Sequence, residues 1–188
     1  MGRLIYVMGA SGSGKDTLIK AAAAALVDRP DIRFARRCIT RPADPDGENH
    51  RPITPHVFNA LVQQGRFAMH WSGNGHHYGI GVEINDWLGT GQTVVVNGSR
   101  KWFAEARFQY PDLVPVMIEV SPPILRERLQ RRGRESAEEI AARLHRHQQM
   151  QPQNEGCIVI NNDGPLAQAS HALTDAICHP VRCEALCR

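Results

Sequence analysis

The sequence predicts an α/β protein in which helices flank a parallel β-sheet. Short apolar runs rich in β-branched residues occur at 3–8, 92–96 and 114–120, and segments of helical composition lie between them. Such runs are typical of parallel strands that are buried on both faces. Strands that alternate with helices form a sheet covered on both sides. The chain has 188 residues, 42% of them hydrophobic, which suits one compact domain.

The first half of the chain alternates between strands, helices and one polar loop. A helix is predicted from Asp16 to Val27, because this segment is rich in Ala, Leu and Lys and stops before Pro30. A basic strand at 34–40 follows, and then a loop at 41–55 that is rich in Pro, Asp and Gly. The next helix, at 55–64, has a proline in its first turn and a glycine just past its end.

The second half continues the alternation. The strand at 114–120 leads through Ser121-Pro-Pro into a helix that ends near Arg132. Ser136 and Glu139 form a Ser-x-x-Glu capping box for another helix, which runs to about 150. A strand at 157–160 and a helix at 165–178 complete a domain that spans 1–180, and a C-terminal tail occupies 181–188.

Composition and charge exclude several classes of protein. The formal net charge of +3 is too small to indicate nucleic-acid binding, although clustered arginines indicate local anionic ligands. No run of about 18 apolar residues indicates a membrane span, and the N-terminal segment does not resemble a signal peptide. We therefore expect a cytoplasmic protein. The five cysteines are loosely spaced, which favours free thiols over a zinc site.

A glycine-rich loop carries the strongest functional signal. Residues 9–15 match the Walker A pattern up to its lysine, between a predicted strand and a predicted helix. Glycines let successive backbone N–H groups point inward and form an anion site at the start of the helix. We therefore expect these residues to bind the phosphates of ATP: Gly9, Ala10, Ser11, Gly12, Ser13, Gly14 and Lys15.

The residue after the lysine departs from this pattern. Walker A motifs have Ser or Thr there to hold Mg²⁺, whereas this chain has Asp16 followed by Thr17. A carboxylate is a suitable Mg²⁺ ligand. Alternatively, Thr17 holds the ion and Asp16 favours the helix N-terminus. The sequence leaves both alternatives open.

Beyond the loop, the chain resembles the guanylate kinase family over almost its whole length. The matching segments are Thr40-Arg41 with Gly47-Glu48, 58–67, His77-Tyr78-Gly79-Ile80, the arginines of 128–143, and Asn161-Asn162-Asp163. The resemblance implies a P-loop NTPase fold with an acceptor-binding subdomain at about 35–90 and an arginine-bearing lid at about 125–147. It implies that Arg128 and Arg132 act with Lys15 on the transferring phosphoryl group, and that Asn161 lies near the donor base.

The residues that read guanine in this family are missing. The chain has Met69 and Asn97-Gly98-Ser99 where the family has a glutamate and an aspartate. Guanine offers N–H donors, which require carboxylate acceptors. The Gly-Lys-Asp of the loop, Gly-Glu-Asn-His at 47–50 and Val-Asn-Gly-Ser-Arg at 96–100 instead resemble the branch of the family that phosphorylates ribose 1,5-bisphosphate.

That resemblance implies that the partners are ATP with Mg²⁺ and a sugar phosphate, and that the product is 5-phosphoribosyl 1-diphosphate, in phosphonate degradation. The expected acceptor-binding residues are Arg37, Arg41, His50, Tyr78, Ser99, Arg100 and Arg143. Three alternatives stay open: a nucleoside monophosphate kinase, a kinase of small-metabolite hydroxyls with Glu48 or Glu83 as base, and a non-catalytic binding module. The oligomeric state is left open, with a homodimer as one option.

Overall fold

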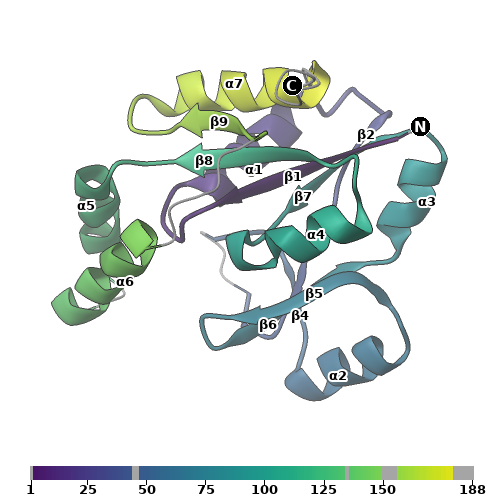
Figure 1. The fold of residues 1–188 in the computed structure, drawn as a ribbon, viewed down its shortest axis with the longest axis horizontal. Helices are drawn as coiled ribbons and strands as arrows, with labels where there is room; N and C mark the ends of the chain where they lie inside the picture. Colours follow the sequence, from purple (N-terminus) through teal and green to yellow (C-terminus); the bar gives the residue numbers. More distant parts are fainter. Residues whose placement is uncertain (1, 44–46, 134–135, 150–155, 180–188) are drawn as a thin grey trace, which may run out of the picture.

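The protein contains two β-sheets with helices around the larger one, as Figure 1 shows. The computed structural model describes residues 2–43, 47–133, 136–149 and 156–179. The side chains at 132, 139, 143 and 146–149 are likewise outside the description. Glu139 of the predicted capping box is therefore not described.

The larger sheet has five strands in the order β2-β7-β1-β8-β9, and all of its neighbours are parallel. Ile5 of the central strand pairs with Val95 on one side and with Val114 on the other. The predicted parallel sheet is therefore confirmed. Its strands are β1 (Arg3–Gly9), β2 (Ile32–Phe34), β7 (Thr93–Asn97), β8 (Val114–Glu119) and β9 (Ile158–Asn161).

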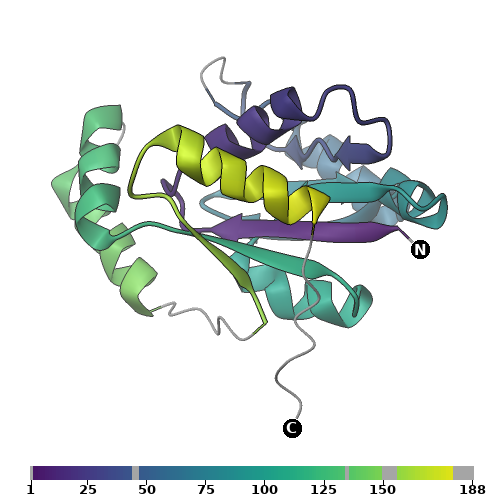
Figure 2. The ribbon, with the colours of Figure 1, turned by 90° about the horizontal axis from the view of Figure 1, so that it is seen from above.

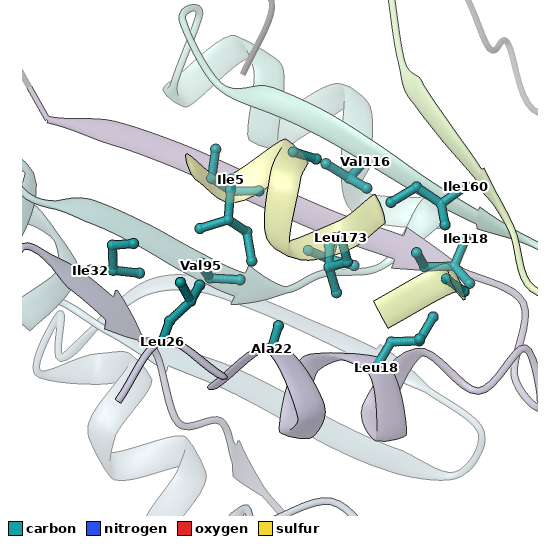
Figure 3. Packing of buried hydrophobic residues seen from close by; sticks show 14 residues of the cluster. Ile5, Leu18, Ala22, Leu26, Ile32, Val95, Val116, Ile118, Ile160 and Leu173 are labelled. Atoms are coloured by element: carbon teal, nitrogen blue, oxygen red, sulfur yellow. The ribbon is translucent and has the colours of Figure 1, made fainter. Parts of the chain in front are cut away.

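Helices cover both faces of this sheet. On one face lie α1 (Lys15–Ala25) and α7 (Leu166–Cys178), side by side in Figure 2. Figure 3 shows Leu18, Leu173 and Ile5 in the hydrophobic cluster between these helices and the sheet. Each of these three side chains is fully buried, and such burial contributes about 1.5–3 kcal/mol per side chain. The other face packs against α3 (Glu83–Gly89) and α4 (Phe103–Gln109).

The smaller sheet has the order β4-β3-β6-β5, with α2 (Pro55–Gln63) beside β5 and β6. Its strands are β3 (Cys38–Ile39), β4 (Arg51–Pro52), β5 (Phe67–Gly73) and β6 (His76–Gly81). The sequence analysis missed the β5–β6 hairpin. Its turn is Asn74-Gly75, and both residues have positive φ, 50° and 76°. Asn-Gly between two strands is a recognised signal for such a turn.

Two expectations for residues 34–55 are wrong in part. The predicted strand at 34–40 is split, because β2 ends at Phe34 in the larger sheet while β3 begins at Cys38 in the smaller one. Between them the chain crosses from one sheet to the other, which turns Arg37 toward the space between them. The predicted loop at 41–55 contains the short strand β4, which pairs with β3.

Two further helices lie beside the carboxyl ends of the strands of the larger sheet (Figure 1). They are α5 (Pro122–Arg132) and α6 (Ala137–Gln149), joined after Gly133 in the left-handed conformation, at φ 63°. Leu125 and Leu129 of α5 pack against Ile140 and Leu144 of α6 and against Ala10. This packing places α5 directly over the glycine-rich loop.

No helix among the described residues is long and apolar enough to cross a membrane. Cys38, Cys157 and Cys178 are free thiols, and Cys183 and Cys187 lie outside the described ranges.

Candidate active site

The glycine-rich loop connects β1 to α1 at the carboxyl edge of the larger sheet. Gly12 and Gly14 have φ of 93° and 83°, which L side chains rarely adopt. Gly14 is the residue that precedes α1, and its carbonyl accepts the first bond of the helix, from the Leu18 amide at 3.0 Å. The loop therefore points backbone N–H groups toward the same space as the positive end of the α1 dipole, which favours an anion.

Asn162 and Arg128 hold this loop from the opposite side. Asn162 Nδ2 donates to the Ser13 carbonyl at 2.7 Å, and Arg128 Nη2 donates to the Asn162 carbonyl at 2.7 Å. Arg128 Nη1 lies 3.4 Å from the same Ser13 oxygen. The predicted residue Asn161 is exposed, and its amide contacts Asp163 instead. That Asn161 lies near the donor base stays a prediction, whereas the loop support from its neighbour Asn162 was not predicted.

Gly14→Ala should disrupt the loop, because the new Cβ would lie 2.6 Å from Asn162 Nδ2 at a positive φ. We expect the free energy of unfolding to fall by more than about 1 kcal/mol, together with a loss of ATP binding. Urea unfolding and nucleotide titration measure the two effects. Gly89→Ala is the matched control, because nothing lies within 4 Å of its Cβ. Equal stability and ATP affinity of the two variants would contradict this account of the loop.

A cavity of about 690 Å³ opens above the loop, between the larger sheet, the smaller sheet and α5. It brings together most of the predicted site residues from both halves of the proposed reaction. They are Gly9, Ala10, Ser11, Gly12, Gly14, Lys15, Asp16, Thr17, Arg37, Arg41, Tyr78, Ser99, Arg100 and Arg128. All three lysines of the chain line it, including Lys20 and Lys101, which the sequence analysis did not single out.

Other predicted residues are not among those that line the cavity. Ser13 belongs to the loop, but it is buried. The side chains of Arg132 and Arg143 lie outside the described residues. His50 is 2% exposed and does not line the cavity. Its Nδ1 and Nε2 each lie 3.0 Å from a backbone carbonyl, of Glu48 and of Arg41, so the ring supports the 41–50 segment from behind. The expectation that His50 contacts the acceptor is corrected accordingly.

A hydrogen-bond network joins cavity-lining residues through Asn97, which is buried at the end of β7 and does not itself line the cavity. Asn97 Oδ1 accepts from Lys15 Nζ at 2.5 Å. Asn97 Nδ2 donates to Asp16 Oδ1 at 2.7 Å and to Glu48 Oε1 at 3.3 Å. Lys15 beside the carboxyl, and more weakly Arg37 and Asn97, hold the pKa of Asp16 well below its usual range. Asp16 is therefore a carboxylate at neutral pH.

Arg37 and Glu48 form a buried ion pair at the edge of this network. Arg37 Nε and Nη2 bond the two oxygens of Glu48, at 2.6 and 2.5 Å, and Nη1 donates to the Asn97 carbonyl at 3.2 Å. Its guanidinium also lies over the Tyr78 ring, 5.1 Å from the centroid. Arg37, predicted to bind a phosphate of the acceptor, thus bonds protein groups through each of its three guanidinium nitrogens. Tyr78 in turn stacks on Trp71, 5.6 Å between centroids.

Neither glutamate suggested as a base is well placed to remove a proton. Both oxygens of Glu48 accept hydrogen bonds from Arg37, so they are already engaged with a protein group. Glu83 begins α3 and does not line the cavity. The site therefore fits an acceptor oxygen that is already ionised, such as that of a phosphate, better than a hydroxyl.

Tyr6 fixes the turn that carries Ser99 and Arg100. Its hydroxyl donates to the Ser99 carbonyl at 2.9 Å and accepts from the Ser99 amide at 2.8 Å. A Cβ on Gly98 would lie 2.2 Å from the Tyr6 ring, so only glycine fits there. Burial also lowers the pKa of Arg100, which lines the cavity beyond this turn. An anion at Arg100 would offset part of that desolvation.

The stability of this turn should depend on pH at the alkaline end. Burial raises the pKa of Tyr6 to about 12, from 10.0 in an exposed tyrosine. Between these values the unfolded chain loses the proton while the folded chain keeps it. The free energy of unfolding should therefore fall by about 2–3 kcal/mol as the pH rises from 10 to 12. Urea unfolding across this range measures the slope, and the same slope in Tyr6→Phe would exclude Tyr6 as its cause.

Three buried side-chain atoms in the described part of the chain lack a hydrogen-bond partner, and all belong to this site. They are Ser13 Oγ in the loop, Asn162 Oδ1 behind it and Arg41 Nε in the cavity wall. Buried polar atoms are normally paired. Among the described residues, the unpaired buried polar atoms are thus concentrated at the loop and the adjoining wall of the cavity.

The oxygen ligands in the cavity fit Mg²⁺ bound together with phosphates. Asp16 presents an ionised carboxylate and Thr17 a hydroxyl at the start of α1. Within the ranges the structure describes, no three metal-ligating side chains of the His, Cys, Asp or Glu type come together. Mg²⁺ at nucleotide sites is usually held by one or two carboxylates plus phosphates and water. Both alternatives, Asp16 and Thr17, remain compatible with this arrangement.

Comparison with known proteins decides the family. The family model for guanylate kinase matches residues 1–179. The chain belongs to the guanylate kinase family. In fold it is similar to the guanylate kinase of Anaplasma phagocytophilum, with a TM-score of 0.69, 15% identity and coverage of 97% of this chain and 88% of the other. Membership in this kinase family accounts for the P-loop at one end of the cavity.

Curated relatives narrow the comparison within the guanylate kinase family. The chain is 49% identical over 173 residues to the ribose 1,5-bisphosphate phosphokinase PhnN of Pseudomonas paraeruginosa, covering 92% of this chain and 93% of the relative. It is 44% identical over 176 residues to the protein of the same name from Thiobacillus denitrificans, covering 94% and 93%. These relatives match almost the whole chain, and they carry the name of a phosphotransferase.

Proposed function

We propose that this protein transfers the γ-phosphoryl group of ATP to the 1-phosphate of ribose 1,5-bisphosphate and forms 5-phosphoribosyl 1-diphosphate. The observation that carries the proposal is one cavity lined both by the P-loop and by the cations Arg41, Arg100 and Lys101. The names of the relatives support the identity of the acceptor.

The walls of the cavity are poorly suited to guanine. Met69 is 1% exposed in the hydrophobic core and does not line the cavity. The Ser99 backbone is bonded to Tyr6, and its side chain offers a hydroxyl where a carboxylate would be required. An acceptor with a second phosphate in place of a base suits the cationic side of the cavity, because each phosphate requires positive charge and N–H donors.

In the reaction, an oxygen of the acceptor 1-phosphate forms a bond to the γ-phosphorus, and the bond from that phosphorus to the β–γ bridging oxygen breaks. ADP leaves with the electron pair. The attacking oxygen already carries negative charge, so no strong base is required. Lys15 and the loop N–H groups bind the donor phosphates, and Arg128 of α5 lies beside them. Mg²⁺ near Asp16 or Thr17 would neutralise charge on the β and γ phosphates.

We also propose separate roles for two segments of the chain. Residues 35–90 contain the smaller sheet and bind the acceptor, and residues 125–147 form a lid that carries Arg128, Arg132 and Arg143. Closure of such a lid excludes water, which would otherwise hydrolyse ATP. Leu125 and Leu129 pack α5 against the loop at Gly12, which supports a lid in contact with the donor site.

A direct comparison of acceptors tests the proposal. Purified protein with Mg²⁺ and ATP is offered ribose 1,5-bisphosphate, GMP and AMP separately, and ADP release is measured with a coupled assay. We expect kcat/KM to be highest for ribose 1,5-bisphosphate, with ³¹P NMR showing a new diphosphate. Higher kcat/KM for GMP would contradict the proposed acceptor and favour a nucleoside monophosphate kinase. Absence of turnover with every acceptor would favour a binding module.

A further inference from the structure

Asn97 contacts both the P-loop and the acceptor-side segment through one side chain. It is 5% exposed at the carboxyl end of β7. Lys15 and Asp16 reach it from the start of α1, and Glu48 reaches it from the segment before β4. Arg37 bonds both its backbone carbonyl and Glu48. Charged groups from the donor and the acceptor sides thus meet at one neutral side chain.

The chemistry of these partners fixes the orientation of the amide. A lysine ammonium only donates, and carboxylates only accept. Asn97 therefore has to present its oxygen to Lys15 and its NH₂ group to Asp16 and Glu48, as the distances of 2.5, 2.7 and 3.3 Å indicate. An aspartate has the same shape but no donor. It would place a third carboxylate against the two that Asn97 now satisfies.

We propose that Asn97 is a positioning residue, which holds Lys15 and Asp16 of the P-loop in register with the Glu48–Arg37 pair. It acts through its amide donor and its neutrality rather than through its volume. This inference rests on the proposed function at one point only, because one of its tests measures turnover of the proposed acceptor. Binding of ATP tests it independently, whichever acceptor is phosphorylated.

Two substitutions separate this role from a structural one. Asn97→Asp preserves the shape of the side chain, whereas Asn97→Ala removes it. If Asn97 only fills space at the end of β7, alanine should be the more damaging change. If it positions charged groups, aspartate should be, because like charges in contact cost several kcal/mol. We expect Asn97→Asp to lower kcat/KM for ATP at least about tenfold further than Asn97→Ala, mainly through KM, and to weaken ATP binding in a titration without acceptor.

Asn59→Asp is the matched control, because Asn59 is exposed on α2 and the same charge change there should leave kinetics unchanged. A charge-conserving swap, Asn97→Asp with Asp16→Asn, covers the case in which Asn97→Asp folds poorly. It restores one amide and one carboxylate to the 2.7 Å contact and keeps the Arg37–Glu48 pair, so Tm should rise above that of Asn97→Asp. The proposal would be overturned if Asn97→Asp lowered kcat/KM for ATP no more than Asn97→Ala does. It would also be overturned if the swap failed to raise Tm above that of Asn97→Asp.

Discussion

Lys15→Met should reduce kcat by at least about 100-fold while the protein stays folded. Lys15 is the cation at the start of α1, its side chain is only 12% exposed, and its Nζ donates to Asn97 Oδ1. Charge that develops on the transferring phosphoryl group is stabilised most by preorganised cations in a site from which water is partly excluded. Methionine preserves the aliphatic chain and removes only the charge and its donors.

Steady-state kinetics with saturating ATP measure this effect, and thermal unfolding reports whether the fold is intact. Loss of Lys15 also leaves Asp16 without its nearest cation. We nevertheless expect only a small change in Tm, because the Asp16 carboxylate is half-exposed and solvent screens its charge. Activity above about one tenth of wild type would contradict the role of the loop as the donor site.

Arg37→Met should destabilise the protein by about 3–5 kcal/mol, because it leaves the buried Glu48 carboxylate without its partner. The side chains of this pair are only 8% and 11% exposed. Arg37 also bonds the Asn97 carbonyl and stacks on Tyr78, so its loss should disturb both walls of the cavity. Urea unfolding measures the free energy of unfolding directly.

Two comparisons sharpen this prediction. Arg29→Met breaks an ion pair of similar geometry with Asp31, at 2.8 and 2.9 Å, but that pair is about half exposed, and the effect should stay below about 1 kcal/mol. Replacing Arg37 and Glu48 together by methionine should recover much of the lost stability, because no charge is then left unpaired. A double variant as unstable as Arg37→Met would show that burial of an unpaired carboxylate is not the cause.

The larger sheet was predictable from sequence because its strands have a recognisable apolar composition. Segments such as 92–96 and 114–120 are apolar on both faces, and buried parallel strands require that pattern. The smaller sheet has no such signal. Its strands β3 and β4 are two residues long, and β5 and β6 mix polar and aromatic residues. Only the Asn74-Gly75 pair could have indicated the hairpin, and it was not used as a turn signal.

The same contrast applies to the site. The phosphate loop is a local motif, and its geometry follows from neighbouring residues. The supports of that loop come from distant strand ends: Asn97 lies 82 residues from Lys15, and Asn162 lies 149 residues from Ser13. Their roles depend on which strands flank β1 in the sheet. The engagement of Arg37 with Glu48 likewise depends on how the chain crosses between the sheets, which no short motif specifies.

The central claim is that one cavity holds ATP and a phosphorylated sugar at opposite ends, and lysine acylation tests it most directly. All three lysines line this cavity, so their labelling by an amine-reactive ester, measured by mass spectrometry, reports on it alone, with the N-terminal amine as internal reference. We predict that ATP with Mg²⁺ protects Lys15 and that ribose 1,5-bisphosphate protects Lys101. Unchanged labelling of Lys101 at acceptor concentrations that saturate turnover would contradict the account.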